Sequence, residues 1–344
     1  MNYLLIAVIS FLAGWVAVQA ALRFFPKLGL MDRPDKYGLK RAPIPYYGGL
    51  AIVTAFMISA LIWLKLDFRL MVFLGVALII AAISFWDDFK GLKPIWRLLM
   101  QVGAGVTLFL SGTMVTAIPN PIGAELPLSN WLIGGIAVGS LLMTVIWVVL
   151  IMNTVNWIDG LNGLPSGVST IASLVIFVLS IKPDNAVDQT AVATMALILG
   201  MVTLAFWLYD FYPAKILMGD TGSMFIGFLL AGFAIYSGGK LATAILVLGF
   251  PIVDAIWVIL RRIFSGKSPF KGDLSHFHHR LLYAGFTMRQ ALCIIYIACL
   301  IFGILAIFLG TGQKLWAFLG LVGTMAILGF LVVILEIEKS REKG

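Results

Sequence analysis

Eleven apolar runs, each about long enough to cross the hydrocarbon core of a bilayer, divide this chain from end to end. They fall at roughly 3–25, 46–64, 70–86, 98–118, 131–152, 164–181, 190–209, 222–237, 241–260, 290–310 and 314–335. Only 12% of the 344 residues are charged, roughly half the share that is usual in a soluble domain. This excludes a soluble enzyme and predicts an all-α integral membrane protein of about eleven transmembrane helices, forming a single domain over residues 1–344.

The basic residues indicate how these helices are oriented. If the N-terminus lies outside, the cytoplasmic connections and the C-terminal tail hold 19 Lys and Arg, and the outside connections hold 5. This asymmetry is typical of the positive-inside rule and predicts a cytoplasmic C-terminus. The net charge of +8 therefore reports orientation and does not imply nucleic acid as a partner. Cys293 and Cys299 lie in one apolar run and offer neither a disulfide framework nor a cysteine metal site.

Polar residues gather at the cytoplasmic ends of the runs. Asp87 and Asp88 follow the third run. Adjacent carboxylates at a membrane boundary repel each other and lose hydration, a cost that metal binding or proton transfer would explain. A solvated helix end is the alternative interpretation.

The segment 153–164 interrupts the apolar sequence with three Asn, one Asp and two Gly, and it contains no Lys or Arg. Positive-inside anchoring cannot explain these polar groups, and a plain turn would need only the glycines. Asn carbonyls and Asp carboxylates are hard oxygen ligands that suit Mg²⁺, and amide edges can bind a nucleobase. The segment therefore favours a functional role.

Two further motifs lie near later runs. Asp220 stands between Gly219 and Gly222, where backbone amides could approach a phosphate, although Gly-Asp-x-Gly is also a common turn. The stretch 275–280 holds every histidine of the chain and suits anion or sugar-phosphate contact better than zinc. Asp254, beside Pro251 in the ninth run, matches no motif, so we expect its loss to cost far less activity.

The first cytoplasmic loop runs from Asp32 through Lys40 and Arg41 to Gly49. Taken alone, it is better explained by orientation charge and turn residues than by a binding role.

Taken together and in this order, these segments resemble the polyprenyl-phosphate N-acetylhexosamine-1-phosphate transferase family of membrane enzymes, over about residues 30–282. The resemblance rests on Asp-Asp, Asn-x-x-Asn-x-x-Asp-Gly-Leu, Met-Gly-Asp-x-Gly-Ser and His-x-His-His-Arg-Leu. Ser-Pro-Phe at 268–270 followed by the histidines is similar to the bacterial branch that starts O-antigen, enterobacterial common antigen and teichoic-acid linkage-unit synthesis. The muramyl-pentapeptide branch is the alternative within the family.

The resemblance implies that undecaprenyl phosphate attacks the β-phosphorus of a UDP-N-acetylhexosamine, most simply UDP-GlcNAc, at the plasma (inner) membrane of a bacterium, and that UMP is released. It also implies Mg²⁺, with Mn²⁺ as a substitute, and leaves a homodimer open. By match of position, the metal ligands are Asp220 and Asn156, the catalytic residues are Asp87, Asp88, His278 and His279, and the substrate-binding residues are Lys40, Arg97, Asp159, Asn162, His276 and Arg280.

One residue departs from the family pattern. Many bacterial relatives carry Asp where this chain has Asn162, so the resemblance implies nucleotide contact there but no acid role. Outside the family, a secondary transporter is the rival interpretation, because acids within membrane spans often mark coupling-ion sites. Transporter acids should lie near mid-span within repeated halves, whereas these lie at one face and no repeat is evident.

Overall fold

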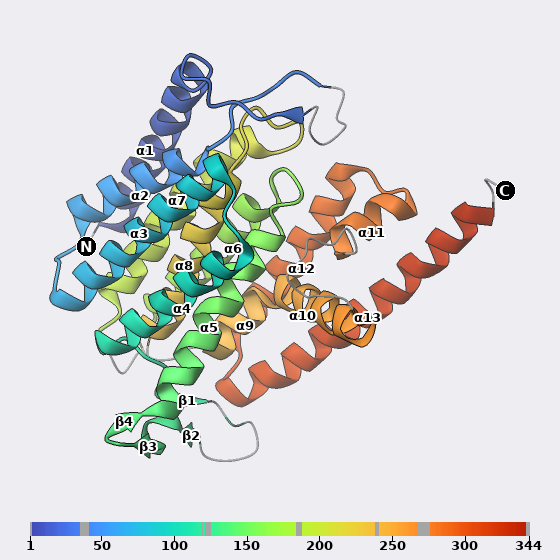
Figure 1. The fold of residues 1–344 in the computed structure, drawn as a ribbon. Coiled ribbons are helices and arrows are strands. Elements are labelled where there is room, and N and C mark those ends of the chain that lie inside the picture. Colours follow the sequence, from blue (N-terminus) through green and yellow to red (C-terminus); the bar gives the residue numbers. More distant parts are fainter. Residues whose placement is uncertain are drawn as a thin grey trace.

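The computed structural model describes residues 2–34, 41–118, 120, 125–183, 188–237, 241–266 and 276–341. Over these ranges the chain is mainly helical (Figure 1). The helices are α1 (Tyr3–Phe24), α2 (Gly49–Trp63), α3 (Phe68–Lys90), α4 (Pro94–Leu110), α5 (Val138–Trp157), α6 (Leu164–Ser180), α7 (Thr190–Asp210), α8 (Gly219–Tyr236), α9 (Leu241–Val247), α10 (Gly249–Phe264), α11 (Phe277–Ala284), α12 (Met288–Phe308) and α13 (Thr311–Arg341). Each apolar run coincides largely with one helix, or with the pair α9 and α10 for 241–260.

Seven helices in the described part of the chain are long and apolar enough to cross a membrane: α1, α3, α5, α7, α8, α12 and α13. The pair α9 and α10 makes an eighth if it is one span, although it bends by 81°. Pro251 stands just after the break, and a proline lacks the N–H that would bond the carbonyl of Val247, so a straight helix cannot continue there. The shorter apolar helices are α2, α4 and α6. The fold is therefore that of an all-α membrane protein.

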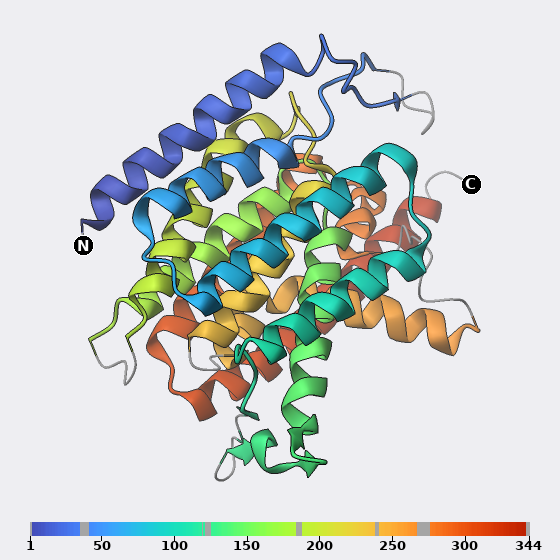
Figure 2. The ribbon, with the colours of Figure 1, turned by 60° about the vertical axis from the view of Figure 1, so that its left-hand side comes forward.

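Helix α8 lies at the centre of the bundle, and every residue from 221 to 235 is buried (Figure 1). Glycines let its neighbours approach closely, as is common where helices pack in lipid. A Cβ at Gly227 would lie 2.8 Å from the Cα of Met152 in α5, and one at Gly232 would overlap the ring of Phe73 in α3. By contrast, α1 and α13 lie on the flanks, with many exposed apolar side chains (Figures 1 and 2).

The fifth span begins later than the sequence predicts. Instead of a helix from residue 131, the chain forms two small antiparallel hairpins, β1 (Ala117–Ile118) with β2 (Leu126–Pro127) and β3 (Leu132–Ile133) with β4 (Ile136–Ala137). A short 3-10 helix, η2 (Leu128–Asn130), lies between them. Gly134 and Gly135 both have positive φ, which is the backbone of a tight two-residue hairpin turn. These glycines explain why an apolar segment folds back as strands before α5 begins.

The contact between α2 and α8 gives a test of this packing. A Cβ at Gly49 would lie 2.2 Å from the backbone nitrogen of Gly222. We therefore expect Gly49→Ala to reduce the free energy of unfolding by about 1–3 kcal/mol or more. The measurement is a lower melting temperature of the detergent-solubilised protein. Gly75→Ala in α3 is the matched control, because nothing lies within 4 Å of its Cβ position. Equal melting temperatures for the two variants would contradict the close approach of α2 and α8.

Candidate active site

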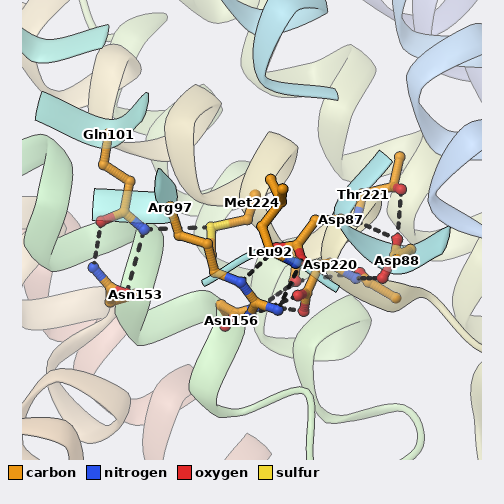
Figure 3. A network of polar contacts seen from close by, with 12 residues as sticks. Asp87, Asp88, Leu92, Arg97, Gln101, Asn153, Asn156, Asp220, Thr221 and Met224 are labelled. Carbon is orange, nitrogen blue, oxygen red and sulfur yellow. Dashed lines mark hydrogen bonds and ion pairs between the residues drawn. The ribbon is translucent and has the colours of Figure 1, made fainter. Parts of the chain in front are cut away.

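An arginine joins two carboxylates from different helices at one end of the bundle (Figure 3). Arg97, in the first turn of α4, pairs through Nε and Nη2 with Asp87 near the end of α3. Its Nη1 lies 2.8 Å from Oδ2 of Asp220 in the first turn of α8. The side chain of Asp87 is only 4% exposed, and a carboxylate this deeply buried needs such a partner. The guanidinium therefore holds α3, α4 and α8 together through charge.

Asp88 points to a different set of partners from its neighbour Asp87. Its Oδ1 accepts hydrogen bonds from the backbone N–H of Asp220 at 2.9 Å and the hydroxyl of Tyr46 at 3.0 Å. Its Oδ2 accepts from the backbone N–H of Thr221 at 2.9 Å and from that residue's hydroxyl at 2.6 Å. The first N–H groups of a helix lack partners within the helix, so Asp88 caps α8 from a distant part of the chain. In doing so it fixes the backbone that carries Asp220.

Asn156 completes the central group from the end of α5. Its side-chain amide donates to Oδ1 of Asp220 at 2.7 Å and to the hydroxyl of Ser223 at 2.9 Å (Figure 3). Among the described residues, its carbonyl oxygen accepts no hydrogen bond. Asn156, Asp87, Arg97 and Asp220 were all predicted as site residues, and the structure brings their side chains together.

The loop between α1 and α2 contributes to this centre, although its sequence alone favoured a turn. The backbone N–H groups of Gly48 and Gly49 donate to the carbonyls of Leu217 and Met218, each at 2.8 Å, just before α8. This pairing brings Tyr46 to Asp88. Burial, and then the nearby carboxylates, raise the pKa of Tyr46, so its phenol keeps the proton that it donates. Lys40, predicted near the phosphates, lies outside the described residues.

The turn between α5 and α6 places Asp159 near the same group of acids. Burial raises the pKa of Asp159 well above its usual value, and Asp210, Asp220 and Asp88 raise it further. Among the described residues, neither the Asp159 carboxylate nor the Asn162 side chain has a hydrogen-bond partner, and both are only partly buried. Both side chains are therefore available to a ligand.

The histidines stand on α11, against the turn that carries Asp159. A Cβ at Gly160 would lie 3.0 Å from Nε2 of His278 and 3.4 Å from Nε2 of His279. The ring of His278 is buried, and its Nε2 has no hydrogen-bond partner among the described residues. His276 precedes them and lies 6.3 Å, ring to ring, from Trp157 at the end of α5. The structure thus brings the histidine motif and the Asn-rich motif side by side.

Arg280 does not point into this group. Its guanidinium bonds the carboxylate of Glu336 in α13, with Nη2 and Oε2 3.0 Å apart. Arg280 also lines a largely apolar cavity of about 370 Å³ between α10, α11 and α13. The resemblance implied substrate contact at this residue, whereas the structure gives its charge a partner within the protein.

The sequence led us to expect that Asp254 lies apart from the motifs, and this expectation is wrong. It lies in α10 and contacts the start of α11: its Oδ2 is 2.9 Å from Nδ1 of His276, and its Oδ1 accepts from the backbone N–H of Phe277 at 2.8 Å. The sequence signal that could have suggested this role is an acid within an apolar run, close to a proline.

No group of three or more His, Cys, Asp or Glu in the described ranges forms a ready metal cage. The hard oxygen donors at the centre are instead two carboxylates, from Asp87 and Asp220, and the amide carbonyl of Asn156. Such a mixed set suits Mg²⁺, which keeps several waters and binds through one or two carboxylates. Arg97 pairs with both carboxylates, but its single positive charge leaves one net negative charge among these three groups, which favours a cation.

The fold and site define an integral membrane protein with an acidic, arginine-bridged centre at the ends of apolar helices. A family model for glycosyl transferase family 4 matches residues 70–238, which include this centre. The probable undecaprenyl-phosphate N-acetylglucosaminyl 1-phosphate transferase of Bacillus subtilis is 30% identical over 337 residues, covering 96% of this chain and 90% of that protein. The decaprenyl-phosphate N-acetylglucosaminephosphotransferase of Mycolicibacterium smegmatis is 31% identical over 85% of this chain and 77% of that protein.

The phospho-N-acetylmuramoyl-pentapeptide-transferase of Staphylococcus carnosus is also similar, at 26% identity over 89% of this chain and 98% of that protein. The chain belongs to glycosyl transferase family 4, among the polyprenyl-phosphate N-acetylhexosamine-1-phosphate transferases.

The buried histidine gives a test by pH. Burial lowers the pKa of His278 well below 6.5, and His279 and His276 lower it further. In the unfolded chain this ring gains a proton near pH 6.5, so the stability that the neutral ring contributes is present above that pH and is lost as the pH falls. We expect melting temperatures to fall less steeply for His278→Phe than for wild type between about pH 7.5 and 5.5. Parallel curves would contradict this assignment.

Proposed function

We propose that this protein transfers N-acetylhexosamine-1-phosphate, with GlcNAc-1-phosphate as the expected group, from a UDP-sugar to undecaprenyl phosphate and so initiates a cell-envelope glycan. The observation that carries the proposal is the convergence of Asp87, Arg97, Asn156 and Asp220 at one end of apolar helices, in a chain whose relatives are named for this transfer. A water-soluble donor and a prenyl acceptor can meet only at such a boundary.

The reaction forms a bond between an oxygen of the lipid phosphate and the β-phosphorus of the donor. The bond from that phosphorus to the bridging oxygen of UMP breaks, and UMP leaves. Both reactants are anions, so catalysis depends on positioning and on neutralising charge. Arg97 can supply positive charge to the phosphates, because its side chain is 34% exposed beside Asp220.

The two adjacent aspartates differ in what they can do. The oxygens of both aspartates are engaged, but by different groups: Asp88 bonds Tyr46 and the first turn of α8, whereas Asp87 bonds Arg97 and the N–H of Leu92. We therefore assign Asp88 the role of holding Asp220 in place. Asp87 faces Arg97, and we assign it contact with the acceptor phosphate as the base of the pair.

We further propose that Asp220 and Asn156 hold Mg²⁺, for which Mn²⁺ can substitute. Asp220 supplies a carboxylate, and the carbonyl of Asn156 has no other partner among the described residues. A bound divalent cation would supply the neutralisation that phosphoryl transfer requires. Asn156 would fix the orientation of the Asp220 carboxylate that receives it.

The remaining predicted residues divide between nucleoside and sugar. We assign Asp159 and Asn162 to the nucleoside side, since both side chains lie on the turn after α5. His278 and His279, whose Nε2 atoms lie against Gly160, together with His276, are assigned to the sugar diphosphate. Lys40 remains a predicted phosphate contact. Arg280 remains a predicted substrate contact, with Glu336 holding its guanidinium in place.

We also propose the topology that the sequence predicts. The seven long helices, the bent pair and the three shorter apolar helices would give eleven spans in one domain. In the bacterial plasma membrane the N-terminus would lie outside, and the site and the C-terminus would face the cytoplasm. The basic residues support this orientation.

Purified protein in lipid nanodiscs should release UMP from UDP-GlcNAc only when undecaprenyl phosphate is present. A panel with UDP-GalNAc and UDP-MurNAc-pentapeptide distinguishes the branches of the family. Turnover of the pentapeptide donor alone would favour the muramyl branch, and no release from any UDP-sugar would reject the proposal.

Asp220→Asn tests the metal assignment. The variant keeps the size of the side chain but loses its charge, so we expect UMP release to fall by about 10²–10³-fold and the Mg²⁺ requirement to rise. Asp188→Asn is the control, because Asp188 is exposed and precedes α7 at the end remote from Asp210. An active Asp220→Asn protein with an unchanged Mg²⁺ dependence would show that the metal binds elsewhere.

A further inference from the structure

Asp254 is a buried acid outside the family motifs, and both of its oxygens contact the helix that carries the histidines. It is 5% exposed and lies in α10, just after the break that follows α9. Its Oδ1 accepts from the backbone N–H of Phe277 at 2.8 Å, and its Oδ2 lies 2.9 Å from Nδ1 of His276. His276 does not cap α11 with its own side chain, so Asp254 supplies the acceptor at the start of that helix.

This geometry determines which ring nitrogen of His276 carries the proton. A carboxylate can only accept, so Nδ1 must be the donor, and in a neutral ring Nε2 is then the bare nitrogen. A partner that bonds one nitrogen of a histidine in this way fixes both the tautomer and the direction of the ring. Asp254 therefore leaves Nε2 as the atom through which His276 can accept a hydrogen bond.

The orientation of His276 extends to the other two histidines. The rings of His276 and His278 are parallel to within 4°, with centroids 5.6 Å apart. The ring of His278 lies 4.3 Å from that of His279. The Nε2 atoms of these last two rings lie 3.0 and 3.4 Å from where a Cβ at Gly160 would be, next to Asp159. One carboxylate thus lies at the start of a row of rings that ends at the proposed donor site.

We propose that Asp254 is a positioning residue for the transfer reaction: it holds His276 as the Nδ1-protonated tautomer and keeps the row of histidines aligned against the turn at Gly160. The inference rests on the proposed function, because the histidines are assigned there to the sugar diphosphate. The contacts that carry it are independent of that assignment.

The chain has three histidines, so ¹⁵N-histidine spectra of the protein in bilayers can resolve each ring. At about pH 8, wild type should show one ring with a protonated Nδ1 and a bare Nε2, and this signal should disappear in His276→Gln. In Asp254→Asn the side chain has one acceptor oxygen for two donors, the N–H of Phe277 and Nδ1–H of His276. If that oxygen accepts from Phe277, the NH₂ group faces Nδ1. The ring should then become Nε2-protonated, so that Nδ1 can accept. An unchanged ring in Asp254→Asn, or a signal that persists in His276→Gln, overturns the proposal.

Activity gives the second measurement. We expect Asp254→Asn to lower kcat for UMP release about 10–100-fold, a loss typical when the partner that orients a functional histidine is removed, with KM for the donor within about twofold. The double variant with His276→Gln should be no slower than His276→Gln alone. If the losses in kcat of the two single variants multiply in the double variant, Asp254 acts independently of His276, and the proposal is overturned.

Asp67→Asn is the matched control, since Asp67 also accepts from a helix start, the N–H of Leu70 in α3. It should leave both measurements unchanged. If Asp254→Asn does not assemble, Asp254→Glu replaces it as the test variant. It keeps a carboxylate and should retain the Nδ1-protonated ring. Loss of that ring signal with full activity would count against the proposal. If wild type releases no UMP from any donor, the proposed function fails, while the ring spectra still decide whether Asp254 sets the tautomer.

Discussion

Carboxylates placed at the end of a membrane helix bundle must be neutralised or hydrogen-bonded, and the whole site depends on how this chain does so. Asp87 and Asp88 are neighbours in sequence, yet they solve the problem differently. Asp87 forms an ion pair with the guanidinium of Arg97, and Asp88 accepts hydrogen bonds from the N–H groups at the start of α8. The two solutions together tie α3 and α4 to the most buried helix of the fold. The same groups that make the acids tolerable also set the distances between them.

The arrangement explains why the central helix starts where it does. The loop before α2 bonds the carbonyls of Leu217 and Met218, and Asp88 bonds the N–H groups that follow them. Gly49 and Gly222 permit backbone contact at this point because neither carries a Cβ. The backbone around Asp220 is consequently held on one side by the N–H groups of Gly48 and Gly49 and on the other by the side chain of Asp88. A residue held in this way can present its carboxylate without rearranging when a charged ligand arrives, which favours electrostatic catalysis.

Much of this could be predicted from sequence because apolar length and motif order are local properties. Each apolar run is largely helical, and the side chains of Asp87, Asn156 and Asp220 lie together as the motifs implied. Tyr46 and Asp254 could not be found in this way, because their roles come from contacts with Asp88 and His276, 42 and 22 residues away. The late start of α5 was missed for a different reason: adjacent glycines in an apolar run permit a hairpin that hydropathy does not distinguish from a helix.

The ion pair between Arg280 and Glu336 connects the last helix to the histidine-bearing helix. Helix α13 is apolar and long enough to cross a membrane, and it carries none of the motifs. A chain shortened to end before Glu336 would leave a partly buried guanidinium on α11 without its carboxylate. Deletions that remove Glu336 would then be felt on α11, as a change in how the neighbouring histidines are held.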